Sequence, residues 1–362
     1  MKVVRFHLIC ESLYDKWKSG FMKKNIIGIL YFFVHFIIEV TSFYIVTYYS
    51  TTTVAWILAL AYDFFAFVPQ GFFGFLKDKG FAINFAVVGM ICSFISLLLL
   101  YFDVFPAIVI FLVGLGNAMI HIEGAYDSLA SSEGKMSPSA IFVAGGSFGV
   151  VIGQILSMYH IHVFYVLFLH LLMIIPLLFV RKYKSFIQRK NFSLYHYDNP
   201  NLSSFVVIFF TILVVIIRAY MGYGIPTAWN KTIFQTFLLY SFMGIGKALG
   251  GIFIDRFGIR KTAFISTIGS LPFLLFGDSI MVISLLGVML FSMTMAITLG
   301  LLVSRLNQYP GVAFGLTTIG LFLGTLPVFF VRVHSLLINC ILVIIFTIFC
   351  AILLSKICRK EV

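Results

Sequence analysis

Several ionisable side chains lie inside long apolar stretches of the chain, where a charge is costly. His35 and Glu39 are four residues apart, so a helix would place them on one face. Asn117, His121 and Glu123 form a second polar group within residues 114–124. In a membrane such residues usually face a cavity or a partner, which predicts a polar pathway through the molecule. The two histidines could instead only hydrogen-bond across helices.

Two further charged residues, Asp63 and Arg218, lie in other apolar stretches. At a rise of about 1.5 Å per residue, Glu39 and Arg218 both come out roughly 21–23 Å from the same membrane face. They could pair across the pathway or face the substrate separately. Glu39 is the first candidate for a proton carrier, followed by His121 and Glu123, because the unperturbed histidine pKa of about 6.5 suits titration near neutrality. Glu123, nearer the cytoplasm, could instead only shape the site.

The elements that position these residues follow from the composition. The 362 residues are 61% hydrophobic and only 10% charged, so lipid is the implied solvent. A spanning helix needs roughly 20 apolar residues, and the alternating pattern of a membrane barrel is absent. We therefore predict an all-α integral membrane protein with about twelve transmembrane helices, near residues 25–48, 52–75, 81–101, 106–129, 138–159, 162–180, 204–228, 231–254, 262–278, 280–301, 310–331 and 335–356.

The net charge of +12 first suggests a nucleic-acid ligand, but the positions of the basic residues exclude one. The Lys and Arg residues fall in the termini and in alternate loops, apart from Arg218, Lys231, Lys247 and Arg332. This is the positive-inside pattern, and it predicts that both termini are cytoplasmic in a multi-pass protein of the cytoplasmic membrane. An even number of spans is required for that, which agrees with twelve.

The chain divides into two hydrophobic halves. Residues 181–203 form the one long polar stretch, and we predict a cytoplasmic linker there between six-helix bundles at 25–180 and 204–356. Residues 1–24 are expected to form a cytoplasmic N-terminal segment without a cleavable signal, and residues 357–362 a cytoplasmic tail. The cysteines predict neither a disulfide framework nor a metal site; they are Cys10, Cys92, Cys340, Cys350 and Cys358.

Each half carries a copy of one loop motif. The second half reads Gly250-Gly-Ile-Phe-Ile-Asp255-Arg-Phe-Gly258-Ile-Arg-Lys, and the first half reads Gly74-Phe-Leu-Lys-Asp78-Lys-Gly. A carboxylate at this position can meet a helix N-terminus and a basic partner, and so hold the cytoplasmic side shut. The predicted gate residues are Gly74, Asp78, Lys79, Gly251, Asp255, Arg256, Gly258 and Arg260.

The repeated loop resembles the one between the second and third helices of each half in major facilitator superfamily transporters. That resemblance implies two parallel repeats with a substrate site between them near the bilayer midplane. Three patches resemble the fosmidomycin-resistance branch of that superfamily, namely His35-Phe-x-x-Glu39, residues 114–124, and Arg218-Ala-Tyr220. Members of this branch are proton-coupled exporters of small polar or drug-like molecules, which implies an antiporter here.

The expected function is secondary active transport of a small molecule, with protons as the coupling ion and efflux as the direction. We expect the bilayer, the substrate and protons to be the partners of a functional monomer, with no cofactor and no enzymatic activity. No phosphate-binding GxxxxGK[ST] motif occurs, which disfavours ATP hydrolysis. Two alternatives stay open: a transport fold that acts as a sensor or assembly factor, and, less favoured, a membrane-embedded lipid-linked transferase.

Overall fold

The computed structural model describes residues 2–225, 232–277, 279–331, 333 and 335–359, with side chains from Asn25 onward. The α-helices are α1 (Lys2–Tyr48), α2 (Ala55–Phe67), α3 (Gln70–Asp78), α4 (Phe85–Tyr101), α5 (Pro106–Ala130), α6 (Ser137–Met158), α7 (Val163–Leu171), α8 (Ile174–Lys182), α9 (Ser204–Gly224), α10 (Ile233–Phe257), α11 (Ile259–Phe264), α12 (Leu271–Phe276), α13 (Met281–Ser292), α14 (Thr294–Arg305), α15 (Pro310–Thr325) and α16 (Leu336–Ile357). Short turns of 3₁₀-helix are η1 (Tyr49–Thr51), η2 (Lys184–Phe186), η3 (Arg189–Leu194) and η5 (Leu326–Phe329), and η4 (Ile265–Gly269) is a π-helical turn.

Several membrane-length passes consist of two helices joined end to end. The pass over residues 55–78, for example, breaks between α2 and α3, where Pro69 has no N–H for the carbonyl one turn earlier. Among the described residues, eleven passes are long and apolar enough to cross a membrane, and α4 is a shorter apolar helix of 17 residues. The prediction of about twelve helices is confirmed, and the chain is a multi-pass membrane protein.

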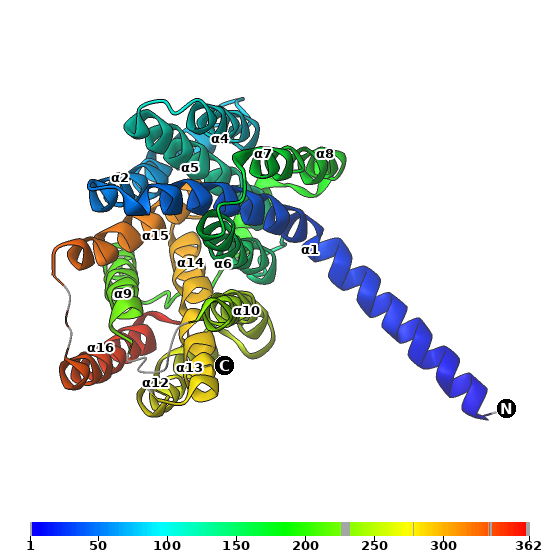
Figure 1. Cartoon of the computed structure of the whole chain (residues 1–362). Coiled ribbons are helices and arrows are strands. Elements are labelled where there is room, and N and C mark those ends of the chain that lie inside the picture. Colours follow the sequence, from blue (N-terminus) through cyan, green and yellow to red (C-terminus); the bar gives the residue numbers. More distant parts are fainter. Residues whose placement is uncertain (1, 226–231, 278, 332, 334, 360–362) are drawn as a thin grey trace.

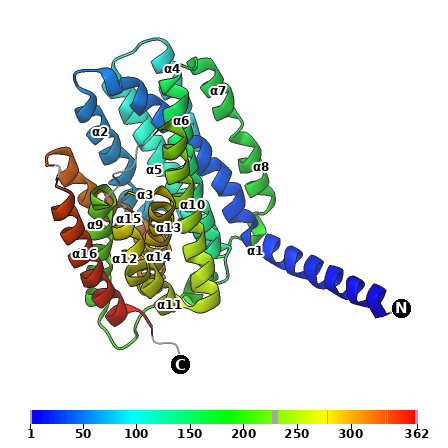
Figure 2. The same ribbon diagram turned by 60° about the horizontal axis from the view of Figure 1, so that its bottom comes forward.

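The helices form two groups that lie side by side (Figures 1 and 2). Helices α1–α8 make one group and α9–α16 the other, with α14 and α15 facing the first group in Figure 1. The groups meet along two seams, α6 against α10 and α2–α3 against α15. At the second seam a Cβ on Gly74 would lie 2.3 Å from the carbonyl oxygen of Gly311, so only glycine allows this approach. The exact domain boundaries stay a prediction.

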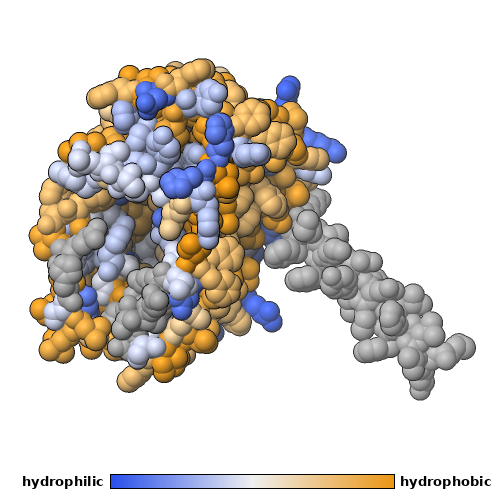
Figure 3. Space-filling view, viewed as in Figure 1, coloured by the Kyte–Doolittle hydropathy of each residue, from blue (hydrophilic) through white to orange (hydrophobic). Residues whose placement is uncertain are grey.

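The two ends of the bundle are distinguished by the linker, which lies at one of them (Figure 2). One end of the bundle carries residues 183–203, and it is called the linker end below. The chain enters the bundle along α1 and leaves it along α16 at this same end (Figure 2). The first part of α1 extends away from the bundle on this side (Figure 1). Seen from the opposite end, apolar surface follows much of the rim while pale and blue residues gather over the middle (Figure 3). An apolar rim is what a protein embedded in lipid requires.

The linker is docked onto both halves. Within the linker, the Asn191 amide donates to the carbonyl of Ala130 at 2.6 Å, in the first half. The backbone N–H of Tyr197 donates to the Ser304 hydroxyl at 2.9 Å, in the second half. Arg305 forms an ion pair with Asp198. The predicted linker is therefore an ordered segment that crosses the linker end and contacts both halves. Lys231 and Arg332, which the sequence pattern predicts on the side of the membrane opposite the linker, lie outside the described residues. Residues 360–362 of the predicted tail also lie outside them.

The arrangement predicts that exposed positions at the linker end share one side of the membrane. In a background without native cysteines, Lys190→Cys and Arg260→Cys should react with an impermeant maleimide from the same side of sealed vesicles. Asp103→Cys, in the α4–α5 connection at the opposite end, should react only from the other side. Labelling of positions 190 and 260 from opposite sides would contradict the twofold topology.

Candidate functional site

A buried polar cluster lies where α1 and α5 meet. Glu39 Oε1 is 3.5 Å from His35 Nε2 and 3.6 Å from His121 Nε2. All three side chains are at least nine-tenths buried. The rings of His35 and His121 are 4.2 Å apart between centroids. The fold therefore gathers two imidazoles around one carboxylate oxygen inside the first half.

Asn117 holds this cluster together from α5. Its side-chain nitrogen lies 3.0 Å from Glu39 Oε1, 3.2 Å from the Ser42 hydroxyl and 2.9 Å from the Tyr62 hydroxyl, so its two hydrogens are shared among three acceptors. These contacts join α1, α2 and α5 at one point. Asp63, the next residue on α2, is half-buried and interacts with Glu39 electrostatically. Asn117 is thus a positioning residue for Glu39, and Ser42 and Tyr62 are partners that the sequence analysis did not name.

Backbone carbonyls set the orientation of both imidazoles. His35 Nδ1 lies 2.9 Å from the carbonyl oxygen of Phe142, and His121 Nδ1 lies 2.9 Å from that of Asn117. A carbonyl can only accept, so each Nδ1 carries the hydrogen. In the neutral rings, both Nε2 atoms consequently present a lone pair toward Glu39. This arrangement is incomplete without a cation or a proton between the rings and the carboxylate.

Glycines on α6 make room for the cluster. A Cβ on Gly146 would lie 2.4 Å from His35 Nε2, and one on Gly149 would lie 2.7 Å from the Cβ of Glu39. The small-residue face of α6 therefore lets its backbone approach α1 at the depth of the cluster. Any larger side chain at these positions would displace the imidazole or the carboxylate.

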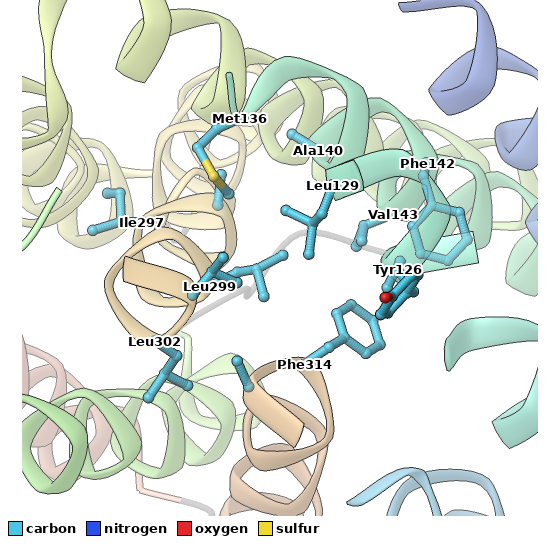
Figure 4. Packing of buried hydrophobic residues seen from close by; sticks show 14 of the residues in the cluster. Tyr126, Leu129, Met136, Ala140, Phe142, Val143, Ile297, Leu299, Leu302 and Phe314 are labelled. Carbon is cyan, nitrogen blue, oxygen red and sulfur yellow. The ribbon is translucent and has the colours of Figure 1, made fainter. Parts of the chain in front are cut away.

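Aromatic residues separate the cluster from the space between the halves. Phe142 of α6 lies 4.9 Å from the His35 ring, and Phe314 of α15 lies 6.5 Å from the His121 ring, between centroids. Figure 4 shows Leu129 and Val143 facing Leu299 and Phe314 of the second half. A space of about 10 Å³ between the halves, the size of a single water site, is lined by Phe314 and Lys247, among others. Lys247 also acts electrostatically on Glu39, so it belongs to the surroundings of the site.

Arg218 does not pair with Glu39 in this structure, which was one of the two arrangements left open by the sequence. Its guanidinium donates to the carbonyl oxygens of Ser266 at 3.0 Å and Phe291 at 2.7 Å. It also stacks on the Phe291 ring at 3.4 Å. All of these partners belong to the second half. Equal depth did not bring the two charges together, because Arg218 points toward the helices of its own bundle.

Glu123 also lies apart from the Glu39 cluster. Its Oε1 is 2.5 Å from Lys77 Nζ, and its Oε2 accepts from the backbone N–H of Phe85 at 3.2 Å. One turn further along α5, Asp127 accepts from the Tyr31 hydroxyl at 2.8 Å. Glu123 thus anchors the α3–α4 loop near the linker end, and both a role in proton coupling and a role in shaping the site stay predictions.

The two loop carboxylates occupy equivalent positions. Asp255, at the end of α10, accepts from the backbone N–H groups of Met136 at 2.8 Å and Ser137 at 3.0 Å, at the start of α6. Asp78, at the end of α3, accepts from Gly311 and Val312 at 2.9 Å each, at the start of α15. Each carboxylate joins one half to the other. The first N–H groups of a helix have no partner within it, so they attract an anion. The predicted contact with a helix N-terminus is present in both halves.

The basic residues of the motifs make weaker contacts than expected. Lys79 Nζ lies over the Tyr309 ring at 5.6 Å, which is a contact across the seam. The Arg256 guanidinium lies over the neighbouring Phe257 ring at 5.6 Å. Arg260 is exposed and makes no ion pair among the described residues. The expected basic partners are therefore absent from the hydrogen bonds that Asp78 and Asp255 make.

Gly258 has a φ of 84°, so it ends α10 in a conformation that favours glycine.

The linker contributes a residue that sequence reasoning missed. Tyr197 Oη donates to the carbonyl oxygen of Gly134 at 2.7 Å and lies 3.5 Å from Asp255 Oδ1. Burial and the negative charge of Asp255 raise the pKa of this phenol above its usual value, so it stays a donor. A tyrosine in a polar linker gave no signal of this role, since the contact depends on how the linker folds back.

The comparisons with known proteins identify the fold. No family model matches the chain, and no curated protein sequence does. The Escherichia coli fucose:proton symporter FucP superposes with a TM-score of 0.59 at 13% identity, over 94% of this chain and 100% of that chain. The human organic anion transporter MFSD10 gives 0.58 and 13%, over 90% and 99%. A bacterial homologue of the iron transporter ferroportin, in an outward-facing state, gives 0.59 and 12%, over 91% and 98%. The chain has the major facilitator fold of these transporters.

Asn117 provides a test of the cluster's structural role. Asn117→Ala should destabilise the protein by about 1–3 kcal/mol, because it leaves buried groups on α1 and α2 without their donor. The measurement is thermal unfolding of the detergent-purified protein. Ser147→Ala is the matched control, since the buried Ser147 hydroxyl has no hydrogen-bond partner among the described residues. Equal melting temperatures for the two variants would show that Asn117 is not the hub of the cluster.

Proposed function

We propose that the chain is a secondary active transporter of the major facilitator superfamily that moves a small molecule across the cytoplasmic membrane. Besides the fold, the observation that carries this proposal is a pair of carboxylate contacts between the halves at the linker end, called latches below. Asp78 and Asp255 each bridge the two halves by two hydrogen bonds to a helix N-terminus. A device that closes one end of the pathway is what alternating access requires.

The latches are suited to opening and closing repeatedly. A hydrogen bond to a charged group contributes roughly 1.5–3 kcal/mol, and water can replace it when the end opens. Beneath the two latches, apolar side chains from the two halves pack against each other and close the space between them. Leu129 and Val143, for example, face Leu299 and Phe314, and this packed layer is called the plug (Figure 4). Rocking one half against the other would separate latches and plug together. We propose that this end is cytoplasmic, in line with the basic residues that it carries.

Proton coupling is proposed for the Glu39 cluster. A proton shared between Glu39 and an imidazole would complete the arrangement in which both Nε2 atoms face the carboxylate. His35 lies on the same helix and His121 on α5, while Asp63 of α2 and Lys247 of α10 also act on Glu39. Because Phe314 belongs to the other half, movement of the halves would change the access of water to the cluster. Protonation would then depend on the state of the pathway.

Efflux is the proposed direction, and a small polar or drug-like molecule the proposed substrate class. Both rest on the resemblance of three sequence patches to the fosmidomycin-resistance branch. The protein is proposed to function as a monomer with both termini in the cytoplasm. The first experiment is a substrate screen in proteoliposomes that contain a pH-sensitive dye. A compound of this class whose addition causes proton flux, absent from protein-free liposomes, supports the proposal.

Glu39→Gln is the decisive variant for coupling. Glutamine keeps the shape of the side chain but removes the titrating group, so proton flux with a compound from the screen should fall to the level of protein-free liposomes. Exchange of the labelled compound without a pH gradient should persist. Flux against a gradient in the variant would assign the proton to another group, and loss of binding would make Glu39 a substrate ligand.

Asp255→Asn tests the latch. The variant loses the charge and places amide hydrogens against the N–H groups of α6, so the closed state should become roughly tenfold to a hundredfold less favoured, matching a loss of about 1.5–3 kcal/mol. In a background without native cysteines, Ser139→Cys in the cavity wall should then react correspondingly faster with a soluble thiol reagent, and transport should slow. Asp103→Asn is the control, because Asp103 is exposed and asparagine also accepts its positive φ. An unchanged reaction rate in Asp255→Asn would remove the latch role.

A further inference from the structure

We propose that His35, Glu39 and His121 form a binding site for a divalent transition-metal cation. One ligand atom from each residue lies within 4.8 Å of the other two. The residues come from two helices, α1 and α5, which Asn117 joins rigidly. Two imidazoles and one carboxylate are a donor set found in zinc and iron proteins. This inference goes beyond the proposed function, because it names a ligand for the site.

The distances fit a metal better than direct hydrogen bonds. Glu39 Oε1 is 3.5 Å from His35 Nε2 and 3.6 Å from His121 Nε2, beyond the usual hydrogen-bond range of about 2.7–3.2 Å. In a tetrahedral site with bonds of about 2.1 Å, neighbouring ligand atoms are roughly 3.4 Å apart. Small side-chain shifts would therefore place a cation between the three atoms.

The outer contacts of the two histidines are also those of metal ligands. Each Nδ1 donates to a backbone carbonyl, of Phe142 for His35 and of Asn117 for His121. Metal-bound imidazoles usually have such a contact, which fixes the tautomer and directs the free lone pair toward the metal. Both lone pairs here are directed toward the same carboxylate.

Two buried oxygen atoms at the cluster lack a partner. Glu39 Oε2 and Asn117 Oδ1 are inaccessible and accept no hydrogen bond among the described residues. A buried carboxylate oxygen without a partner is costly, and coordination of a cation would satisfy it. Glu39 could then bind through both oxygens. These unsatisfied atoms are an observation independent of the histidine geometry, and they indicate that the cluster is built to receive a positive ligand.

The donor types select the class of cation. Imidazole nitrogen suits Zn²⁺, Fe²⁺, Co²⁺ and Ni²⁺, whereas Mg²⁺ and Ca²⁺ prefer oxygen ligands throughout. Two charged residues lie nearby. The negative charge of Asp63 on α2 would attract a cation, and the positive charge of Lys247 on α10 would repel it. Access would come from the side of Phe314, whose ring lies near His121 and lines the cavity between the halves. A metal ion would thus reach the site when the halves move apart.

Binding of Co²⁺ to the purified full-length protein in detergent tests the proposal. We expect one Co²⁺ per chain, with the strong visible absorption of a four- or five-coordinate ion, and no displacement by a large excess of Mg²⁺. His121→Gln and Glu39→Gln should each weaken binding by more than the roughly 10–100-fold typical of losing an outer contact. His196→Gln removes an exposed imidazole and should bind like the wild type.

A second measurement covers variants that fold poorly. Co²⁺ should raise the melting temperature of the wild type and of His196→Gln but not of Glu39→Gln. Absence of stoichiometric Co²⁺ binding to the wild type, or equal binding by His121→Gln, would overturn the metal site. The proposed transport function is judged separately by the liposome screen: proton flux with a small molecule but no Co²⁺ binding removes only the metal proposal, and Co²⁺ binding without flux for any compound removes only the proposed proton-coupled transport.

Discussion

Lipid provides no hydrogen bonds, and this constraint explains the positions of the buried charges. Each carboxylate or cation inside the bundle must find its partners in the protein. Arg218 uses two backbone carbonyls and the face of an aromatic ring, and Glu123 uses Lys77. Two of the buried charges are satisfied only in part, since Arg218 Nε and Nη1 and Glu39 Oε2 have no hydrogen-bond partner among the described residues.

The same constraint applies to helix ends, and the fold uses it twice. The first N–H groups of α6 and α15 are satisfied by carboxylates that come from the other half. The N-termini of these helices are therefore completed only when the halves are together at the linker end. This dependence couples the local hydrogen bonding of two helices to the relative position of the bundles. The loop motif that occurs in both halves supplies the two carboxylates that make these contacts.

Hydrophobic runs were sufficient to predict the twelve passes, because each is long enough to be read without knowledge of its neighbours. Depth along a helix was also open to estimation, and it placed Glu39 and Arg218 at one level. Rotation about the helix axis was not. Arg218 has the expected depth but faces Ser266 and Phe291 within its own half. The contacts of the linker were beyond prediction for a related reason, since a polar stretch without periodicity does not show where it folds back.

The docked linker would limit how far the halves separate if they rock as proposed. Its contact with the first half at Asn191 and its contact with the second half at Tyr197 are separated by six residues. A chain of that length spans at most about 20 Å when fully extended. As long as both contacts held, the linker would act as a stop on opening at its end of the bundle. The extent of the proposed motion would then be set by the length of a short peptide as well as by the shapes of the two bundles.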